Sequence, residues 1–531
     1  MFDYVIIGAG SAGCVLANRL SADPNTRVLL LEAGGPDKKQ EIHIPAAFPK
    51  LLKTSFDWAY YTEPQTHLHN RQLYWPRGKV LGGSSSINVM VYTRGNRGDY
   101  DAWQKLGNGG WSFADVLPYF KKLENRELVS SEDHGTGGHL NVAQLRYVNP
   151  LTRAFLSACE EIGIPPNNDF DGLEQTGVGL FPVTQKLGKR HSSAAAYLKP
   201  ALKRPNLRVE VSAHATRLLF EGRRAAGVEY VQEGERKQGV AEREVILCGG
   251  AINSPQLLML SGIGPADHLR DIGVPVISDL PGVGQNLQDH IAGSVSYECT
   301  KPVSMAAAEK MGNVINYLLL RKGMLASNVA EAGGFIKMRS ACDVPDVEII
   351  FAPVFFMGHG YLNPPGHGFT IGAIVMHPES RGRITLRSSD PFAPPVIQPN
   401  YFSEQSDLML IVEGLKLARR VAQGKAFDSY RGGEVWPDIS ATDDDAMADF
   451  VRRTAETLYH PIGTCSMGTD LMGVVDNELR VRGVERLRVV DASVMPTHIT
   501  GHPNSAIMMI GEKAADLITA ASQTTARAAF G

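Results

Sequence analysis

The feature that most constrains the fold is a glycine-rich turn near the start of the chain, Gly8-Ala9-Gly10-Ser11-Ala12-Gly13. An apolar run typical of a buried strand, Tyr4 to Ile7, precedes it, and apolar residues at helical spacing follow it. A second apolar segment, Arg27 to Leu31, then gives the order strand, helix, strand. In this setting the spacing GxGxxG predicts a Rossmann-like unit that binds a dinucleotide.

Each glycine of the turn has a physical role in such a unit. Gly8 permits the tight turn after the strand, and Gly10 lets a pyrophosphate approach the backbone N–H groups at the start of the helix. Gly13 lets the helix pack closely against the strand. Glu32 ends the second strand 19 residues after Gly13 (32 − 13), where a carboxylate can bind the two hydroxyls of an adenosine ribose.

Length, charge and cysteine pattern limit the remaining possibilities. A chain of 531 residues is too long for one compact core, so we expect two or more domains. The net charge of −3, without a basic block, argues against nucleic acid as a partner. The six cysteines are scattered without a CxxC pair, so we expect neither a zinc site nor a disulfide framework.

The hydrophobic pattern bears on localisation. The chain enters its first strand at once, without a basic segment or cleavage site before it. No stretch reaches the roughly 18 uninterrupted apolar residues that a membrane-spanning helix needs. We therefore expect a cytoplasmic protein, and peripheral contact with the inner membrane stays open.

Three further segments combine apolar runs with turns, and two of the turns are glycine-rich. The segment WPRGKVLGGSSSINVMVYTRG, residues 75–95, carries large apolar side chains and predicts a loop buried against something large and flat. The segment REVILCGGAINSPQLLMLSGIG, residues 243–264, predicts a strand, a Gly-Gly turn and a helix that begins at Ser254-Pro255. The segment LRVVDASVMP predicts a strand that ends at Asp491, before a helix through Ile507 to Ile518.

Together these segments resemble the glucose–methanol–choline (GMC) oxidoreductase family over essentially the whole chain. The motifs that carry the resemblance are the GxGxxG turn and then, in order, GKVLGGSSSIN, GAINSPQLLMLSGIG, PGVGQNLQDH, YHPIGTCSMG and VVDASVMP. Six motifs in the right order make a chance match implausible. Within the family, the chain is most similar to bacterial FAD-dependent alcohol and choline dehydrogenases.

The resemblance implies an α/β fold in which a Rossmann-like FAD-binding domain is interleaved with a sheet-plus-helix (α+β) substrate-binding domain. We assign residues 1–155, 205–290 and 455–531 to the FAD-binding domain. The substrate-binding domain then comprises residues 156–204 and 291–454, in which DVEIIFAPVFF and FTIGAIVMHP predict strands.

The resemblance also implies, position by position, which residues contact FAD. They are expected at the pyrophosphate and adenosine ribose, at the flavin, at the adenine, and beside the pyrophosphate and ribityl chain. Relatives that attach FAD covalently use a histidine where this chain has Ile87, so non-covalent binding is expected. The residues expected at the pyrophosphate and adenosine ribose are Gly8, Gly10, Ser11, Ala12, Gly13, Glu32 and Ala33, and those expected at the flavin are Arg77, Leu81, Gly83, Asn88, Val89 and Ser505. Ala215 is expected at the adenine, and Asp491 and Ala492 beside the pyrophosphate and ribityl chain.

The histidine of YHPIGTCSMG, His460, could by itself be a packed core residue, a metal ligand or a catalytic base. In the resembled family this histidine faces the flavin, and a second catalytic histidine or asparagine lies close to 44 positions later. Counting gives 460 + 44 = 504, so the spacing favours Asn504, with His502 as the rival and His498 nearby. Neutral His460 can accept the hydroxyl proton of an alcohol while Asn504 donates a hydrogen bond to the same oxygen. A metal role would need clustered ligands, which the sequence lacks.

Three functions fit these expectations. The leading one is oxidation of a primary alcohol to an aldehyde, with electrons passed to a quinone or another acceptor. The second is an oxidase that uses O2 and releases H2O2, although the bulk of Val89 and Leu458 favours restricted access for O2. The third is a lyase or decarboxylase, and the pair His460 and Asn504 favours redox chemistry over it.

The sequence limits the substrate only loosely. Glu331 matches by position the carboxylate that choline-oxidising relatives use against the trimethylammonium group, but a structural role as a hydrogen-bond acceptor fits it better. The apolar run Ile349 to Gly358, with Phe351, Phe355 and Phe356, favours an aliphatic or aromatic alcohol over a sugar.

Overall fold

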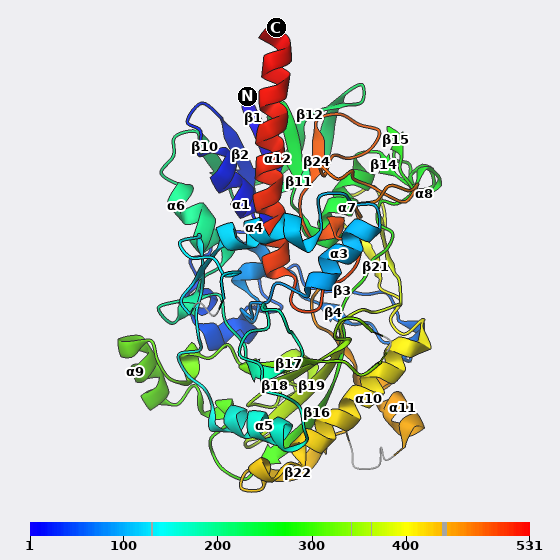
Figure 1. Ribbon diagram of the computed structural model, residues 1–531. Helices are drawn as coiled ribbons and strands as arrows, with labels where there is room; N and C mark the ends of the chain where they lie inside the picture. The colour runs from blue at the N-terminus through cyan, green and yellow to red at the C-terminus, as the bar shows by residue number, and fades with distance from the viewer. Residues whose placement is uncertain (129–130, 341, 363, 438–442, 531) are drawn as a thin grey trace.

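The computed structural model describes residues 1–128, 131–340, 342–362, 364–437 and 443–530. Two large sheets dominate it, one in the upper half and one in the lower half of the view, and helices lie against each (Figure 1). The mixed α/β fold predicted from the sequence is confirmed.

The upper sheet is built around the strands expected at the start of the chain. Its parallel part has the order β10-β2-β1-β13, with β24 on the other side of β13. The antiparallel strands β12 and β11 continue from the long strand β13. Strands β1 and β2 are buried almost throughout, which explains their continuous apolar sequences. The bounds are β1 Phe2–Ile7, β2 Val28–Leu31, β10 Leu207–Glu210, β11 Ala213–Glu221, β12 Arg224–Gln232, β13 Glu235–Leu247 and β24 Leu487–Val489.

Two long-range helix contacts hold the ends of the chain together. Helix α1 (Ser11–Leu20) packs against α12 (Asn504–Phe530), which also contacts α4 (Phe113–Leu123). Gly511 allows this close approach, because a Cβ atom there would lie 3.1 Å from Val15 Cβ. Helix α12 runs upward from the middle of the molecule, so both termini lie at the top (Figure 1).

Helix α7 (Gly250–Leu260) begins four residues before the start at Ser254 that the sequence predicts. That prediction is wrong because it treats Pro255 as a residue of the first turn. The helix tolerates this interior proline, since the hydroxyl of Thr464 donates to the carbonyl of Ala251 at 2.6 Å. A backbone N–H at position 255 would otherwise bond that carbonyl.

The lower sheet contains both strands predicted for the second domain. Its order is β17-β18-β19-β16-β22, all antiparallel, and β23 pairs with the start of β16. Helix α10 (Gln405–Ala422) packs on one face, together with α5 (Pro150–Glu161). The bounds are β16 Ile291–Cys299, β17 Ala332–Ile336, β18 Val347–Ala352, β19 Gly368–Val375, β22 Arg431–Trp436 and β23 Glu456–Thr457.

Shorter elements complete the fold. The helices are α2 Gln40–His43, α3 Arg97–Lys105, α6 Lys199–Ala201, α8 Ala266–Asp271, α9 Met311–Leu320 and α11 Asp444–Thr454. Short strand pairs are β3 Tyr60–Tyr61 with β4 Tyr74–Trp75, β5 Glu124–Arg126 with β6 Leu140–Val142, β8 Gln185–Lys186 with β9 Lys189–Arg190, β14 Ile263–Gly264 with β15 Ser278–Asp279, and β20 Arg383–Thr385 with β21 Val396–Gln398. Strand β7 spans Gly177–Leu180.

The strands of each sheet come from segments that are separated along the chain. Residues 2–31, 207–247 and 487–489 supply the upper sheet, and residues 291–375 and 431–457 supply the lower one. The predicted boundaries near residues 155 and 455 fall inside α5 and just before β23, so the domain limits stay a prediction. Among the described residues, no helix is both long and apolar enough to cross a membrane.

Candidate active site

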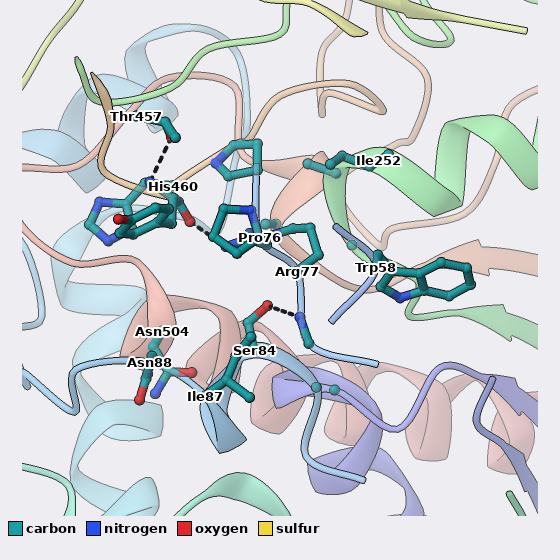
Figure 2. A pocket seen from close by; sticks show the side chains of 18 of the residues that line it. Trp58, Pro76, Arg77, Ser84, Ile87, Asn88, Ile252, Thr457, His460 and Asn504 are labelled. Carbon is teal, nitrogen blue, oxygen red and sulfur yellow. Dashed lines mark hydrogen bonds between the residues drawn. The ribbon is translucent and has the colours of Figure 1, made fainter. Parts of the chain in front are cut away.

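A long cavity has walls from both sheets and from the loops between them. Its wall includes the glycine turn and Glu32 from the upper half of the molecule, together with His460 and His502. Figure 2 shows part of it, with Arg77, Asn88, His460 and Asn504 around the space. The cavity therefore brings together the chemistry-bearing motifs that the sequence keeps hundreds of residues apart.

The glycine turn has the geometry expected of a pyrophosphate site. Gly8 has φ = +105°, and a Cβ atom there would lie 2.4 Å from the carbonyl oxygen of Cys248. At Gly13 a Cβ would lie 1.9 Å from the Gly8 carbonyl oxygen, so only glycine lets α1 approach the strand. Gly10, by contrast, borders the cavity, and a Cβ atom there would lie 4.0 Å from its nearest neighbour, the carbonyl oxygen of Cys248. The N-terminal end of α1, with Ser11 and the positive end of its dipole, thus faces open space.

Glu32 closes the same end of the cavity. Its carboxylate accepts hydrogen bonds from the N–H groups of Ala9 at 2.9 Å and Gly34 at 2.8 Å. Burial nonetheless raises the pKa of Glu32 to about 7. A ligand hydroxyl that donates to this carboxylate would replace the hydrogen bonds from water that burial removes. The two hydroxyls of an adenosine ribose are the donors expected here.

The loop 75–95 forms the middle of the wall. Trp75 and Met90 are buried, as their apolar side chains predict. Gly83 touches the glycine turn, because a Cβ atom there would lie 2.8 Å from Gly10 Cα. Arg77 donates to the carbonyl of Tyr459 at 2.6 Å, which ties this loop to the segment that carries the candidate base.

Most of the predicted cofactor residues line the cavity, and three do not. Gly13 acts through helix packing, and Leu81 is buried in the core. Ser505 donates from its hydroxyl to the carbonyl of Thr93, so its side chain is directed away from the wall. The predicted residues on the wall are Gly8, Gly10, Ser11, Ala12, Glu32, Ala33, Arg77, Gly83, Asn88, Val89, Ala215, Asp491 and Ala492, with Ile87 beside them.

This arrangement fits FAD. The cavity wall has a glycine cradle and a buried carboxylate, that of Glu32. The N-terminal ends of two helices, α1 and α12, also face it. The hydroxyl of Ser11 donates to Oδ1 of Asn504 at 2.7 Å, which joins these two helix ends. A dinucleotide whose two phosphates are anionic, and whose isoalloxazine gains negative charge on reduction, is the ligand that such a wall would hold.

The backbone of the candidate base is held firmly. Tyr459 has φ = +70°, a conformation that costs a non-glycine residue free energy. Asp289 supports it by accepting from the N–H of His460 at 2.7 Å and from the hydroxyl of Thr457 at 2.5 Å. The hydroxyl of Tyr401 donates to the same carboxylate. This network fixes the position of His460 on the cavity wall.

The protonation of His460 follows from its neighbour His290. The Nε2 atom of His290 lies 2.9 Å from the carbonyl oxygen of Met376, which can only accept, so His290 carries its proton on Nε2. Burial lowers the pKa of His290 well below its ordinary value, which leaves Nδ1 as an acceptor. The Nδ1 atom of His460 lies 3.0 Å from it and therefore donates. The free lone pair of His460 is then on Nε2, the atom that a base needs.

Burial also lowers the pKa of His460 well below its ordinary value, and the neighbouring His502, His290, His498 and Arg77 lower it further. His460 is therefore neutral at neutral pH. A buried, neutral imidazole with a fixed tautomer can accept a proton, because its Nε2 atom carries a lone pair and no proton.

The structure places His502, rather than Asn504, against His460. The two imidazole rings are perpendicular with centroids 5.0 Å apart. The Nε2 atom of His502 donates to the buried carboxylate of Glu348 at 3.0 Å. Asn504, the first residue of α12, also lines the cavity, and its Oδ1 accepts from Ser11, so its role as the second catalytic residue stays a prediction.

Two further residues of this site escape sequence reasoning. His290 lies in the PGVGQNLQDH motif, and Glu348 lies on β18 in a strand that reads as ordinary apolar sequence. Nothing in this motif shows that His290 would contact His460, which lies 170 positions later. Among the described residues, no group of three or more His, Cys, Asp and Glu side chains is arranged to hold a metal ion.

The wall from the lower sheet combines apolar residues with the polar residues Ser294, Thr370, Glu456 and Thr457. Ile350 and Ala352 face the cavity, whereas the alternating residue Phe351 packs against Phe155 of α5 with ring centroids 4.8 Å apart. Phe355 is also away from the wall, so Phe356 is the member of the predicted aromatic trio that lines it.

Glu331 lies elsewhere. It is fully buried and does not line the cavity. Its carboxylate accepts from the Asn149 N–H at 2.8 Å and from the hydroxyls of Thr152 and Ser327, each at 2.6 Å. Its geometry is that of a structural hydrogen-bond acceptor.

Comparison with known families decides the identity of this site. The family model for GMC oxidoreductases matches residues 2–292, and its C-terminal counterpart matches residues 378–511. The chain belongs to the GMC oxidoreductase family. It is an alcohol-oxidising flavoenzyme, and FAD is its cofactor.

Individual GMC proteins are similar over nearly the full length. The alcohol dehydrogenase [acceptor] of Pseudomonas putida is 45% identical, over 98% of this chain and 96% of that protein. The mitochondrial choline dehydrogenase of Mus musculus is 45% identical, over 97% of this chain and 89% of that protein. Among solved structures, a formate oxidase from Aspergillus oryzae, described for modification of its FAD, has a TM-score of 0.93 and 30% identity, over 98% of this chain and 99% of that one.

Proposed function

We propose that this GMC oxidoreductase oxidises a primary alcohol with an apolar side chain to the aldehyde and passes the electrons to a quinone-like acceptor. The observation that carries the proposal is the neutral, tautomer-fixed His460 on the wall of a cavity that fits FAD. Its similarity to an alcohol dehydrogenase named for a separate acceptor supports the choice of electron acceptor.

When bound, FAD supplies the acceptor for the hydride that leaves the alcohol carbon. The residues of this chain handle the proton. Nε2 of His460 accepts the hydroxyl proton, and His290 keeps that nitrogen unprotonated by accepting from Nδ1. We assign to His502 the second position at the alcohol oxygen, which its contact with His460 and its anchoring by Glu348 support. Asn504 is then a residue that joins the ends of α1 and α12.

The apolar residues of the wall support a neutral substrate. Ile350, Ala352 and Phe356 line the cavity from the lower half of the molecule. Glu331, the carboxylate that would suit a quaternary ammonium group, is away from the cavity and has its oxygens bonded internally. An aliphatic or aromatic alcohol would therefore bury its side chain at little desolvation cost, whereas choline would not find this carboxylate.

An oxidase that reduces O2 to H2O2 is the second candidate. The bulk of Val89 and Leu458, which pack on the same apolar cluster and line the cavity, favours the acceptor-dependent reaction over it. A lyase or decarboxylase is less well supported, because a fixed proton acceptor suits removal of a hydroxyl proton.

The test is a screen of primary alcohols with an artificial acceptor, phenazine methosulfate, and separately with air. We expect aliphatic and aromatic alcohols to be oxidised faster than choline or glucose, and turnover with phenazine to exceed turnover with O2. Hydrogen peroxide formed at the rate of the dye reaction would make the protein an oxidase. Choline as the best substrate would refute the proposed substrate class.

A further inference from the structure

Helix α9 (Met311–Leu320) is an apolar element on the outside of the molecule. Its sequence, MGNVINYLLL, contains no charged residue. It stands away from the body at one side of the lower half (Figure 1). Its exposed apolar side chains are Met311 at 72%, Ile315 at 48%, Leu318 at 57%, Leu319 at 76% and Leu320 at 60%. Large apolar side chains gathered in this way mark a contact surface in a soluble protein.

One side of α9 is tied to the turn between β8 and β9. The ring of Tyr317 is buried, and its hydroxyl donates to the carbonyl of Gly188 at 3.1 Å. The side chain of Arg146, at the same place, donates to the carbonyl of Arg321 at 3.0 Å. Leu187, at the tip of this turn, is 71% exposed. The helix and the turn therefore form one apolar ridge, which we call the α9 ridge: Leu187, Met311, Ile315 and Leu318 to Leu320.

Cationic side chains surround the α9 ridge. Lys310 precedes the helix, Arg321 and Lys322 follow it, and Lys186 and Lys189 flank Leu187. Glu309, beside Lys310, forms an ion pair with Lys50 at 2.5 Å. The chain as a whole carries a net charge of −3, so this gathering of positive charge runs against the overall sign. An apolar strip bordered by lysine and arginine is the pattern of a helix that lies in a membrane interface.

The α9 ridge is also close to the cavity. Helix α9 packs on the short helix at Met324–Ala326, which packs on the one at Pro45–Leu51. Met324 and Leu325 pack on the cluster that contains Phe48 and Val329, and both of these line the cavity. The short helix at Met324–Ala326 therefore connects the ridge to the cavity wall.

From the exposed apolar residues and the surrounding cations, we infer that the α9 ridge docks this protein on the surface of a lipid bilayer that contains anionic lipid. The leucines enter the acyl boundary while the lysines and arginines contact lipid phosphates. Docking at this place would bring the cavity next to the phase in which apolar alcohols and quinones dissolve. The inference goes beyond the proposed reaction and does not depend on it.

The test is sedimentation of the FAD-containing protein with vesicles of phosphatidylcholine alone or with phosphatidylglycerol added. We expect binding to the anionic vesicles, weaker binding to the neutral ones, and loss of binding at high salt. The variant Leu319→Ser/Leu320→Ser should weaken binding by more than roughly tenfold, because two leucines no longer leave water. Lys186→Glu/Lys322→Glu should remove the preference for anionic vesicles.

A matched control is available on other parts of the surface. Leu173 and Leu471 are each 87% exposed, so Leu173→Ser/Leu471→Ser removes the same two side chains elsewhere. It should bind vesicles as the unaltered protein does. All variants should keep their flavin and their rate with a water-soluble alcohol and acceptor, which separates this test from that of the reaction. Failure of the unaltered protein to bind anionic vesicles, or equal loss in the control, would overturn the inference. A dimer that only the α9 variant dissociates would also do so, by making the ridge an interface between copies.

Discussion

At the scale of single residues, the site depends on which nitrogen of His460 carries the proton. The carbonyl of Met376 sets the tautomer of His290, and His290 sets that of His460. Asp289 holds the backbone of His460 in place. The base is thus defined by hydrogen bonds, and its low pKa follows from burial among other imidazoles.

His460→Ala should leave FAD bound, because the glycine turn and Glu32, which fit its pyrophosphate and ribose, are unchanged. The anaerobic rate of flavin reduction by alcohol should fall by roughly 10²–10⁴, the range for a lost general base. Since the pKa of His460 lies below its ordinary value, the unaltered enzyme should show a constant rate through neutral pH and slow only as acid protonates the base. The variant should lack this acid decline. Stopped-flow bleaching of the flavin measures both, and an unchanged rate would make His460 a packed core residue.

His502→Ala and Asn504→Ala separate the two candidates for the second position. We expect His502→Ala to lower the flavin reduction rate by roughly 10² while the flavin content stays normal. Asn504→Ala should have a smaller effect on that rate and should weaken FAD retention, because Ser11 loses its acceptor. The same stopped-flow assay, with flavin content measured by absorbance, compares them. The opposite order would restore the role that the spacing argument gives to Asn504.

At the scale of elements, two helix N-termini and one loop form the cofactor wall. Helices α1 and α12 come from opposite ends of the chain, and their packing aims both positive ends into one cavity. The contact between α1 and its strand depends on Gly13, where no space is left for a side chain. Substitution in α1 should therefore be least tolerated at Gly13.

Gly13→Ala should be purified with little or no flavin, because its Cβ would lie 1.9 Å from the Gly8 carbonyl oxygen and displace α1. Gly35→Ala is the matched control at the same end of the site, since a Cβ there meets no atom within 4 Å. The ratio of flavin to protein absorbance checks both. Full flavin content in Gly13→Ala would show that the helix can shift without loss of the site.

At the scale of the whole molecule, both halves supply walls of the cavity that fits FAD, and the side chain at position 87 is an isoleucine that lines it. An alkyl side chain forms no bond to a flavin. Acid precipitation should therefore release yellow FAD into the supernatant, where its absorbance is measured. A yellow pellet under a colourless supernatant would contradict non-covalent binding.

The sequence by itself determined the dinucleotide turn and several strands of each sheet, because these depend on local patterns, whereas FAD was predicted from the resemblance to a family. Gly8, Gly10 and Gly13 are read from spacing within one turn, and the alternation along β18 is read from neighbours two residues apart. His460 stood out because it belongs to a motif of contiguous residues.

Only the tertiary structure decided which residues meet His460. His290 approaches from the residue before β16 and His502 from the segment before α12, and their proximity depends on how the lower sheet packs against the upper half of the molecule. The two-residue difference between His502 and Asn504 is invisible to spacing, since a turn before a helix can direct either side chain into the cavity. The packing of distant elements likewise directs Phe351 away from the cavity, against Phe155, and leaves α9 exposed. No local pattern encodes this packing.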